Sequence, residues 1–253
     1  QSFSITRDAQ RPHKIWFQCW RGSCGQRGLV IDEEGIRLYL YTPAGNKDDK
    51  GDLIIPDTTF HKPLSPQERK DITERYDLSE GRLGMEGVKK DKITNNIIIP
   101  WRTRNTITQT YVNIGWIEKG LTAKKSHLSN HDVANRLYWP HYRFAHGKII
   151  LVEDAFSAMR ITDVAADLNL HVRGVALLGS HFQNTVDPIS IRQHTSYVMV
   201  VLDPDMWPKG HIDAQRWLRA QHVNAKATVL SADPKDVPRS ELEKLIFEFD
   251  DIG

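Results

Sequence analysis

Two apolar segments in the second half of the chain have the length of β-strands, and both end in acidic residues. Residues 147–152 precede Glu153, and residues 197–202 precede Asp203 and Asp205. A continuous apolar run of this length is typical of a strand that is buried on both faces, as in a parallel sheet. The acids are then expected at the carboxyl edge of that sheet, where α/β folds place their sites.

Helical periodicity and further strands surround these two segments. Residues 172–178 and 223–230 have the pattern of strands. Residues at helical spacing predict helices after Glu153, after Asp205 and near the end of the chain. The apolar positions of the first helix are Ile161, Val164, Ala165 and Leu168, and those of the last are Leu242, Leu245, Ile246 and Phe249. The middle helix is marked by Ala214, Trp217, Leu218 and Gln221. Ser240 and Glu243 have the spacing of a capping box for the last helix. Strands that alternate with helices predict an α/β domain with a parallel sheet flanked by helices.

The part of the chain before residue 147 has shorter strand-like runs. Ser65, Pro66 and Glu68 have the spacing of a helix start, and residues 43–63 are rich in turn formers and predict a loop or linker. Runs at 96–101 and 110–114 predict a twisted antiparallel sheet. We therefore expect an α+β subdomain before the parallel sheet.

Basic residues outnumber acidic ones in residues 82–148, and aromatic residues lie among them. The aromatic residues are Trp101, Tyr111, Trp116, Tyr138 and Trp139. This combination suits single-stranded nucleic acid, because cations meet the phosphates and bases stack on rings. The alternative is a solvated basic surface above buried aromatic residues.

Residues 13–31 have the pattern of a hairpin whose turn brings Cys19 and Cys24 together. Cys-x4-Cys followed by Gly25 is similar to one knuckle of a zinc ribbon. A tetrahedral zinc site needs four ligands, and His13 is the one further candidate nearby. Two reduced cysteines in a hairpin are the alternative.

Composition limits the class of protein. The chain has 253 residues, a formal net charge of +2 and 40% hydrophobic residues, enough for one large or two small packed domains. Its two cysteines are too few for a disulfide framework. There is no membrane-length apolar run and no signal-peptide pattern, so we expect a soluble cytoplasmic protein.

The acids at the predicted sheet edge suggest a cation site. Asp203 and Asp205 are two residues apart, so on an extended chain both point to the same side. Their repulsion with Glu153 is relieved most simply by a hard divalent cation such as Mg²⁺. An acid after a strand is also often a helix cap, and Asp154 is the residue to which that alternative applies.

Three motifs resemble the TOPRIM domain of DNA primases and topoisomerases, and most closely the primases of tailed phages. They are residues 152–158 (Val-Glu-Asp-Ala-Phe-Ser-Ala), 177–179 (Leu-Leu-Gly) and 202–205 (Leu-Asp-Pro-Asp). The resemblance covers roughly the last hundred residues well and the preceding stretch more loosely. Asp154 stands where the family commonly has Gly, and Ser157 where it commonly has Asp.

The resemblance implies a division of the chain and a set of site residues. It implies a partial zinc-ribbon hairpin over 1–35, a basic primase subdomain over 36–146 and a TOPRIM catalytic domain over 147–253. The implied catalytic and metal-binding residues are Glu153, Asp203 and Asp205, with Asp233 and Asp236 completing a site for Mg²⁺ or Mn²⁺. Cys19 and Cys24 would form part of a Zn²⁺ site. The implied nucleic-acid and nucleotide contacts are Arg102, Arg104, Lys124, Lys125, Arg136 and Lys148.

The function implied is that of a DNA primase, a nucleotidyltransferase that makes short RNA primers on single-stranded DNA during replication. Its partners would be the template strand, ribonucleoside triphosphates and a replicative helicase, in the host cytoplasm if the protein is phage-encoded, with no membrane involved. Two alternatives remain open: a TOPRIM-type metal-dependent nuclease, and a non-catalytic module that binds single-stranded nucleic acid.

Overall fold

A computed structural model of the chain describes residues 3–8, 11–19, 27–32, 36–41, 61–92, 94–104, 111–120, 126–128, 137–142, 147–178, 191–192, 194–195 and 197–251. Side chains are described from residue 61 onward, apart from those of 102–104, 111–114 and 126–128. The chain forms two compact units, Gln1–Asp52 and Leu53–Gly253.

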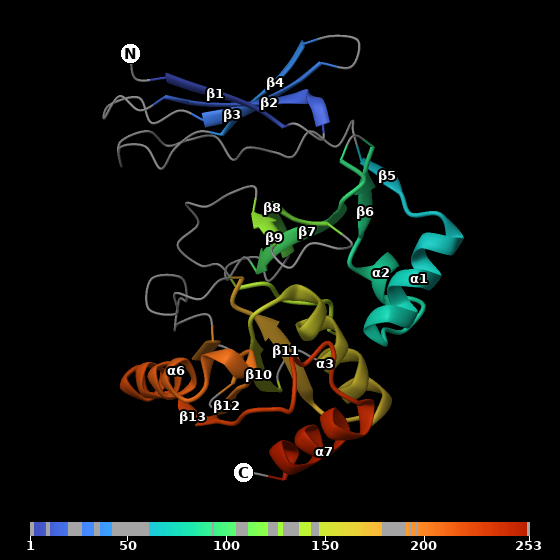
Figure 1. The fold of residues 1–253 in the computed structure, drawn as a ribbon. Helices are drawn as coiled ribbons and strands as arrows, with labels where there is room; N and C mark the ends of the chain where they lie inside the picture. Colours follow the sequence, from blue (N-terminus) through green and yellow to red (C-terminus); the bar gives the residue numbers. More distant parts are fainter. Residues whose placement is uncertain are drawn as a thin grey trace. The chain divides into compact units, whose positions relative to one another are not determined.

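The first unit contains a four-stranded antiparallel sheet with the strands in sequence order (Figure 1). Its strands are β1 (Phe3–Asp8), β2 (Arg11–Cys19), β3 (Arg27–Asp32) and β4 (Ile36–Tyr41). The pairing of β2 with β3 confirms the predicted hairpin. The sheet also continues past residue 35, because β4 pairs with β3. Cys19 ends β2, whereas Cys24 lies outside the described residues, so the zinc site stays a prediction.

The second unit begins with an antiparallel sheet of five strands, again in sequence order. They are β5 (His61–Pro63), β6 (Lys89–Asp91), β7 (Ile97–Arg104), β8 (Tyr111–Lys119) and β9 (Ser126–Leu128). The antiparallel sheet predicted from the runs at 96–101 and 110–114 is confirmed by the pairing of β7 with β8. Within the predicted loop or linker, residues 61–63 form a strand and residues 43–60 lie outside the described part.

Helices α1 (Pro66–Tyr76) and α2 (Arg82–Met85) join the first two strands of this sheet. The predicted capping box is confirmed: the Glu68 amide donates to Ser65 Oγ (3.2 Å), and the Ser65 amide donates to Glu68 Oε2 (2.8 Å). Buried residues on α1 are Ile72 and Tyr76. Its other positions lie mostly at the surface, as its sparse apolar pattern indicates.

Three of the aromatic residues proposed to stack on bases are core residues instead. Trp101, Tyr138 and Trp139 are all buried. The Trp101 ring nitrogen donates to the Leu137 carbonyl (3.1 Å), which satisfies its polar atom inside the core. For these three the stacking prediction is wrong, because their rings are buried. Alternation along β7 turns Trp101 inward with Ile97 and Ile99, and Tyr138 and Trp139 pack in the core beside the parallel sheet.

The second sheet of this unit is parallel throughout, which confirms the predicted α/β pattern. Its strands are β10 (Lys148–Val152), β11 (Val172–Ala176), β12 (Tyr197–Val200) and β13 (Asn224–Ala227), in the order β11-β10-β12-β13. At Gly174 of β11 the sheet lies so close to a helix that an added Cβ would be 2.3 Å from the Ala158 carbonyl oxygen. Glycine permits that close approach.

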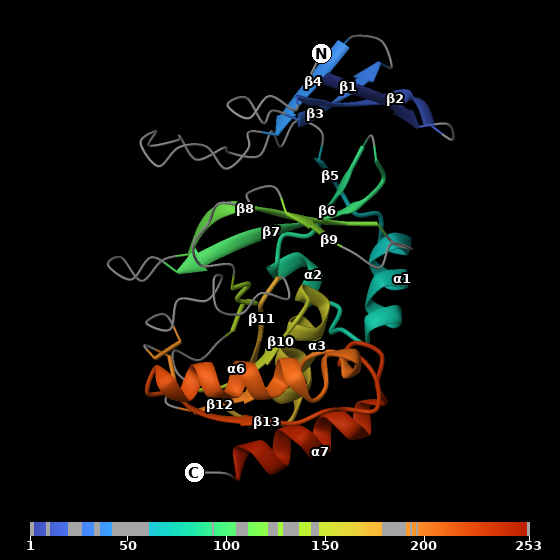
Figure 2. The same cartoon turned by 60° about the vertical axis from the view of Figure 1, so that its left-hand side comes forward.

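Helices cover both faces of the parallel sheet (Figures 1 and 2). They are α3 (Ala155–Asp167), α6 (Lys209–Ala220) and α7 (Arg239–Asp250). Ile150 and Val152 pack in one core cluster with α3 and α7, and Ile149 and Leu151 pack in another with α6. The continuous apolar run of β10 is therefore buried on both sides, as its pattern predicts.

Helix α7 begins differently from the prediction. It starts at Arg239 after Pro238, which adopts an extended conformation and makes no side-chain cap hydrogen bond. Ser240 is already the second helical residue, so the predicted capping box is wrong. Glu243 instead accepts a hydrogen bond from Arg239 Nε (3.0 Å), one turn earlier on the same helix.

A buried ionic network joins the antiparallel sheet's helices to α3. Arg82 Nε donates to Asp163 Oδ1 (2.8 Å), and Arg82 Nη1 donates to Glu86 Oε1 (3.0 Å). The Tyr138 hydroxyl donates to the other oxygen of Glu86 (2.9 Å). Buried charges are tolerated when they are paired and hydrogen-bonded in this way. The network fixes α2 against the parallel-sheet layer that carries the acidic residues.

Within the described residues, no helix is long and apolar enough to cross a lipid bilayer.

Candidate active site at the edge of the parallel sheet

Glu153 and Asp203 lie beyond the carboxyl ends of two adjacent strands, β10 and β12. The strands are paired up to this edge, where the Val201 amide donates to the Leu151 carbonyl (2.8 Å). The chain leaves β10 into α3 on one face, and leaves β12 toward α6 on the other. Such a point, where connections diverge, is where open α/β sheets bind ligands.

The turn after β12 differs from the extended chain that the sequence spacing suggested. Asp203 precedes a 3₁₀ turn, η2 (Pro204–Met206), so the argument that Asp203 and Asp205 point to the same side of an extended chain is wrong. Asp205 is exposed. His211 is buried beneath the turn and accepts a hydrogen bond from the Leu202 amide at Nε2 (3.1 Å). Burial lowers the pKa of His211, which keeps the ring neutral and able to accept this bond. The sequence reading did not single out His211.

Burial and mutual repulsion raise the pKa values of the two strand-end carboxyls. The pKa of Glu153 is raised by desolvation and then by the charge of Asp205, against the opposing effect of the Asp203 backbone amide. The pKa of Asp203 is raised to about 6, by desolvation and then by the charge of Glu153. Glu153 Oε1 is buried without a hydrogen-bond partner among the described residues. The positive charge of Lys235 lowers both pKa values but does not outweigh desolvation and repulsion, so both remain raised.

These features fit a hard divalent cation. Among the described residues, no three acidic, histidine or cysteine side chains converge closely enough to form a complete cation site by themselves. Mg²⁺ does not require such a cage, because it usually binds one or two carboxylates and completes its coordination with water and substrate phosphates. The orphaned oxygen of Glu153 and the raised pKa of Asp203 indicate which carboxylates would hold it.

Asp154 has a different role from Glu153. It is the N-cap of α3, where Oδ1 accepts hydrogen bonds from the amides of Phe156 (2.8 Å) and Ser157 (3.2 Å). This confirms the helix-cap alternative. Asp154 also lies 3.0 Å from Lys235 Nζ and 3.9 Å from Lys119 Nζ. Burial alone would raise the pKa of Asp154, but the two lysines outweigh it and lower the pKa.

Asp233 and Asp236, the other predicted metal ligands, lie beside Lys235. Asp233 accepts a hydrogen bond from Ser157 Oγ (2.8 Å) and forms a close ion pair with Lys235 Nζ. Asp236 is exposed, 4.0 Å from the same ammonium. The sequence analysis named the two acids of this segment but not Lys235, which lies between them in the chain.

Lys119, the last residue of β8, is a further buried cation at this edge. Its ammonium lies 5.3 Å from the centre of the Phe156 ring and 5.9 Å from that of Tyr76, and these two rings are stacked. Desolvation lowers the pKa of Lys119, although Asp154 opposes the shift. The alternation that buries Ile117 predicts the same face for Lys119, and that signal was available in the sequence.

Of the predicted basic contacts, Lys148 alone has a described side chain, and it does not lie at this edge. Lys148 starts β10 at the opposite end of the strand, where its ammonium donates to the carbonyls of Phe249 (3.2 Å) and Asp250. A cation suits this place, because the carbonyls at a helix C-terminus carry partial negative charge. The contact of Lys148 with nucleic acid or nucleotide stays a prediction. Arg102 and Arg104 belong to β7, but their side chains lie outside the described residues. The other candidates lie outside them altogether: Lys124, Lys125 and Arg136.

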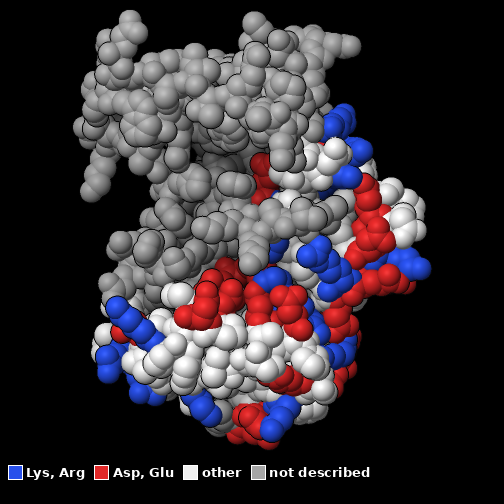
Figure 3. Space-filling view, viewed as in Figure 1, with Lys and Arg blue, Asp and Glu red and all other residues white. Residues whose placement is uncertain are grey.

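Figure 3 shows acidic side chains gathered near the middle of one face, with lysine and arginine side chains among them.

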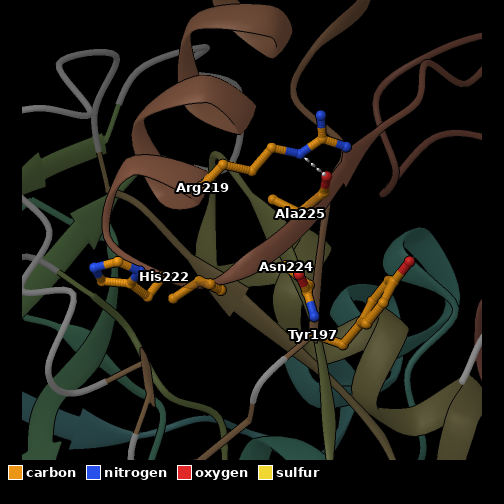
Figure 4. A pocket seen from close by; sticks show the side chains of 6 residues that line it. Tyr197, Arg219, His222, Asn224 and Ala225 are labelled. Carbon is orange, nitrogen blue, oxygen red and sulfur yellow. Dashed lines mark hydrogen bonds between the residues drawn. The ribbon is translucent and has the colours of Figure 1, made fainter.

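A separate hollow of about 600 Å³ lies at the amino ends of β12 and β13 (Figure 4). Its lining residues are Tyr197, Arg219, His222, Val223, Asn224 and Ala225. Arg219 Nε donates to the Ala225 carbonyl within it (3.0 Å). None of the described residues that line this hollow carries a carboxylate, and it lies at the amino ends of the strands, whereas Glu153 lies at the carboxyl end of β10.

Comparison with known proteins relates this arrangement to a characterised fold. No protein-family profile and no curated protein match the sequence. The crystal structure of the primase fragment of the bacteriophage T7 primase-helicase protein is similar over 97% of this chain and 99% of that one, with a TM-score of 0.55 and 11% identity. The chain has the fold of a phage primase fragment. A structure of T7 lagging-strand DNA polymerase interacting with primase domains bound to an RNA/DNA hybrid and dTTP is also similar, covering 74% of this chain and 91% of that one (TM-score 0.48, 13% identity). At the level of the fold, the primase resemblance of the sequence motifs is confirmed.

Proposed function

We propose that this protein is a DNA primase that makes short RNA primers on single-stranded DNA. The observation that carries the proposal is the pair Glu153 and Asp203. Their carboxylates lie at adjacent strand ends, and both have raised pKa values in a chain with the primase-fragment fold. Phosphoryl transfer mainly requires positioning and neutralisation of charge, which suits an edge where two carboxylates form no ion pair with a described lysine or arginine.

The proposed roles follow from the surroundings of each carboxyl group. Glu153, Asp203 and the exposed Asp205 would hold Mg²⁺ or Mn²⁺, which when bound neutralises charge on the triphosphate and on the attacking 3′-oxygen. As the alternative to assisting the metal, Glu153 would accept the proton of the primer 3′-hydroxyl as a general base, and burial raises the pKa of its carboxyl. Buried His211 would keep the Asp203 turn in place through the Leu202 amide.

The partners follow from the same proposal. The template would be single-stranded DNA and the substrates ribonucleoside triphosphates, with Arg102, Arg104, Lys124, Lys125 and Arg136 as candidate phosphate contacts. Zn²⁺ held with the help of Cys19 and Cys24 belongs to the proposal too, as does association with a replicative helicase. These assignments rest on the sequence motifs and the shared fold.

The test is primer synthesis with single-stranded DNA, ribonucleoside triphosphates and Mg²⁺ or Mn²⁺. Asp203→Ala should abolish RNA products while circular dichroism shows an intact fold. Asp213→Ala is the matched control, because Asp213 is an exposed aspartate on α6 of the same sheet layer. RNA synthesis by Asp203→Ala at the rate of the parent would reject the assignment.

The same reaction mixture separates the alternatives. Shortened DNA that depends on Asp203 and on the metal would instead identify a nuclease. Retarded DNA mobility with neither synthesis nor cleavage would identify a binding module.

A further inference from the structure

The acidic residues at the sheet edge fall into two groups that differ in their contacts. Asp154 and Asp233 are both paired with the ammonium of Lys235, at 3.0 Å for Asp154 and in closer contact for Asp233. Within the described part of the chain, no lysine or arginine forms an ion pair with Glu153, Asp203 or Asp205. One group is in direct contact with a lysine, and the other has no such contact among the described residues.

Several further contacts hold Asp154 and Asp233 in place. Ser157 Oγ lies 2.9 Å from Asp154 Oδ2 and 2.8 Å from Asp233 Oδ1, so the hydroxyl bridges the two carboxylates. The Lys235 amide adds a hydrogen bond to Asp233 Oδ1 (3.2 Å), and Lys119 lies 3.9 Å from Asp154. Oxygens of both carboxylates are thus already engaged by donors of the chain.

Lys235 is itself held at this position. Its side chain is 18% exposed, and the side chains of Asp154 and Asp233 are 20% and 14% exposed. The segment around it is anchored to α3, because Arg160 Nη1 donates to the carbonyls of Pro234 (2.9 Å) and Val237 (2.7 Å). A cation held among carboxylates by a fixed backbone resembles a bound metal ion more closely than it resembles a mobile surface lysine.

We propose that the Lys235 ammonium takes the place of one divalent cation at this edge, neutralising Asp154 and Asp233 so that metal binds only to Glu153, Asp203 and Asp205. The inference rests on the proposed function, because it concerns how many metal ions that reaction uses. It makes Lys235 a positioning residue: it acts through the carboxylates it neutralises. Asp233 is then a ligand of Lys235 and does not bind Mg²⁺.

The physical reason is that two carboxylates at this distance from one ammonium repel each other strongly once the ammonium is removed. A divalent cation satisfies such a pair with oxygen ligands that are already in place. Replacing Lys235 by an uncharged residue should therefore create a binding place for an additional cation. Replacing it by arginine should not, because arginine keeps the charge.

The experiment is titration of the full chain with Mn²⁺, following free Mn²⁺ by electron paramagnetic resonance. The parent and Lys235→Arg should bind the same number of ions, and Lys235→Met should bind one more. Lys235→Met with Asp233→Asn should return to the parent number, because one of the two carboxylates is gone. Lys244→Met, which removes an exposed lysine of α7, is the matched surface control.

The outcomes separate this inference from the proposed function. An unchanged Mn²⁺ number in folded Lys235→Met overturns the inference, as does an ion in the parent that Asp233→Asn removes. Loss of all Mn²⁺ binding in Asp203→Ala supports the proposed metal site, and unaltered binding there rejects it whatever Lys235 does. Should Lys235→Met fail to fold, recovery of its fold by Mn²⁺ supports the inference. Failure to fold at every Mn²⁺ concentration shows a purely structural lysine and overturns it.

Discussion

Asp203 weakens the folded state at neutral pH, and removing its charge should therefore stabilise the protein when no metal is bound. In the folded chain this carboxyl is desolvated and lies near the charge of Glu153, which raises its pKa to about 6 from the ordinary 3.8. Asparagine has nearly the same shape but no charge to desolvate. We predict that Asp203→Asn unfolds at higher urea concentration than the parent at pH 8 in the presence of a chelator.

The size of the effect follows from the pKa. The difference between 3.8 and about 6 corresponds to about 3 kcal/mol, at about 1.4 kcal/mol per pH unit. Because Asp203 is only partly buried, solvent screening reduces this figure. We expect a gain of about 1–2 kcal/mol in the free energy of unfolding, in line with the general cost of clustered charges at functional sites.

The sign also fixes the pH dependence. A carboxyl whose pKa is raised on folding binds its proton more tightly in the folded state, so its contribution to stability is present below pH 3.8 and is lost as pH rises through about 6. The advantage of Asp203→Asn should therefore be full at pH 8, about half as large at pH 5, and absent below pH 4. Mg²⁺ should reverse the order at pH 8, because it stabilises only the chain that binds it.

Urea unfolding followed by tryptophan fluorescence at pH 8 and pH 5 measures these differences, with Asp213→Asn as the exposed control. Destabilisation of Asp203→Asn at pH 8 without metal would refute the reasoning. An equal difference between variant and parent at both pH values would also refute it, since it would show that the charge of Asp203 is not what matters.

Three further predictions follow from the same structure. The Mn²⁺ affinity of the parent should fall about tenfold between pH 7 and pH 5, measured by calorimetry, because protons compete for Asp203 at a pKa of about 6; a constant affinity would contradict this. Arg82→Met should lower the free energy of unfolding by about 3–5 kcal/mol, because the buried carboxylates of Glu86 and Asp163 lose their ion-pair partner. Lys70→Met removes an exposed ion pair with Glu74 and should change the free energy of unfolding by less than about 1 kcal/mol. Gly174→Ala should lower the free energy of unfolding by about 1–3 kcal/mol, because the added Cβ clashes with a carbonyl of α3. Gly84→Ala is the control and should leave the stability unchanged, because its added Cβ meets nothing within 4 Å. Equal melting temperatures for the two variants would contradict the packing argument.

The sequence was sufficient to predict the parallel sheet and the strand ends that carry the acids. Continuous apolar runs are a strong signal for strands buried on both faces, and β10 and β12 follow it. The acids at their ends then become neighbours because parallel strands present the same end to one edge. That reasoning needs no knowledge of side-chain contacts, and so Glu153 and Asp203 could be placed from the pattern alone.

Other features depend on tertiary contacts that a local pattern does not contain. Proline at 204 turns the chain into a 3₁₀ conformation, so spacing along an extended strand could not orient Asp205. Trp101, Tyr138 and Trp139 have the composition of a stacking surface, but tertiary packing decides their burial: Trp101 and Tyr138 lie in the core cluster with α3 and α7, and Trp139 lies in the cluster with α6. The charge of Lys148 is visible in the sequence, whereas its hydrogen bonds to the end of α7 depend on a contact about a hundred residues away in the chain.

The two departures from the TOPRIM pattern are explained together by the start of α3. Position 154 is the N-cap of this helix and position 157 is its third residue, so both lie in the first turn, where backbone amides favour a negative charge. The family resemblance implies Gly at the first position and Asp at the second, whereas this chain has Asp154 and Ser157. One carboxylate is present in the turn in either case. Here it caps the helix, and Ser157 bridges it to Asp233, so both carboxylates can share the ammonium of Lys235. The exchange therefore preserves the number of charges at the sheet edge, and among the described residues it leaves Glu153 and Asp203 without a lysine or arginine in direct contact.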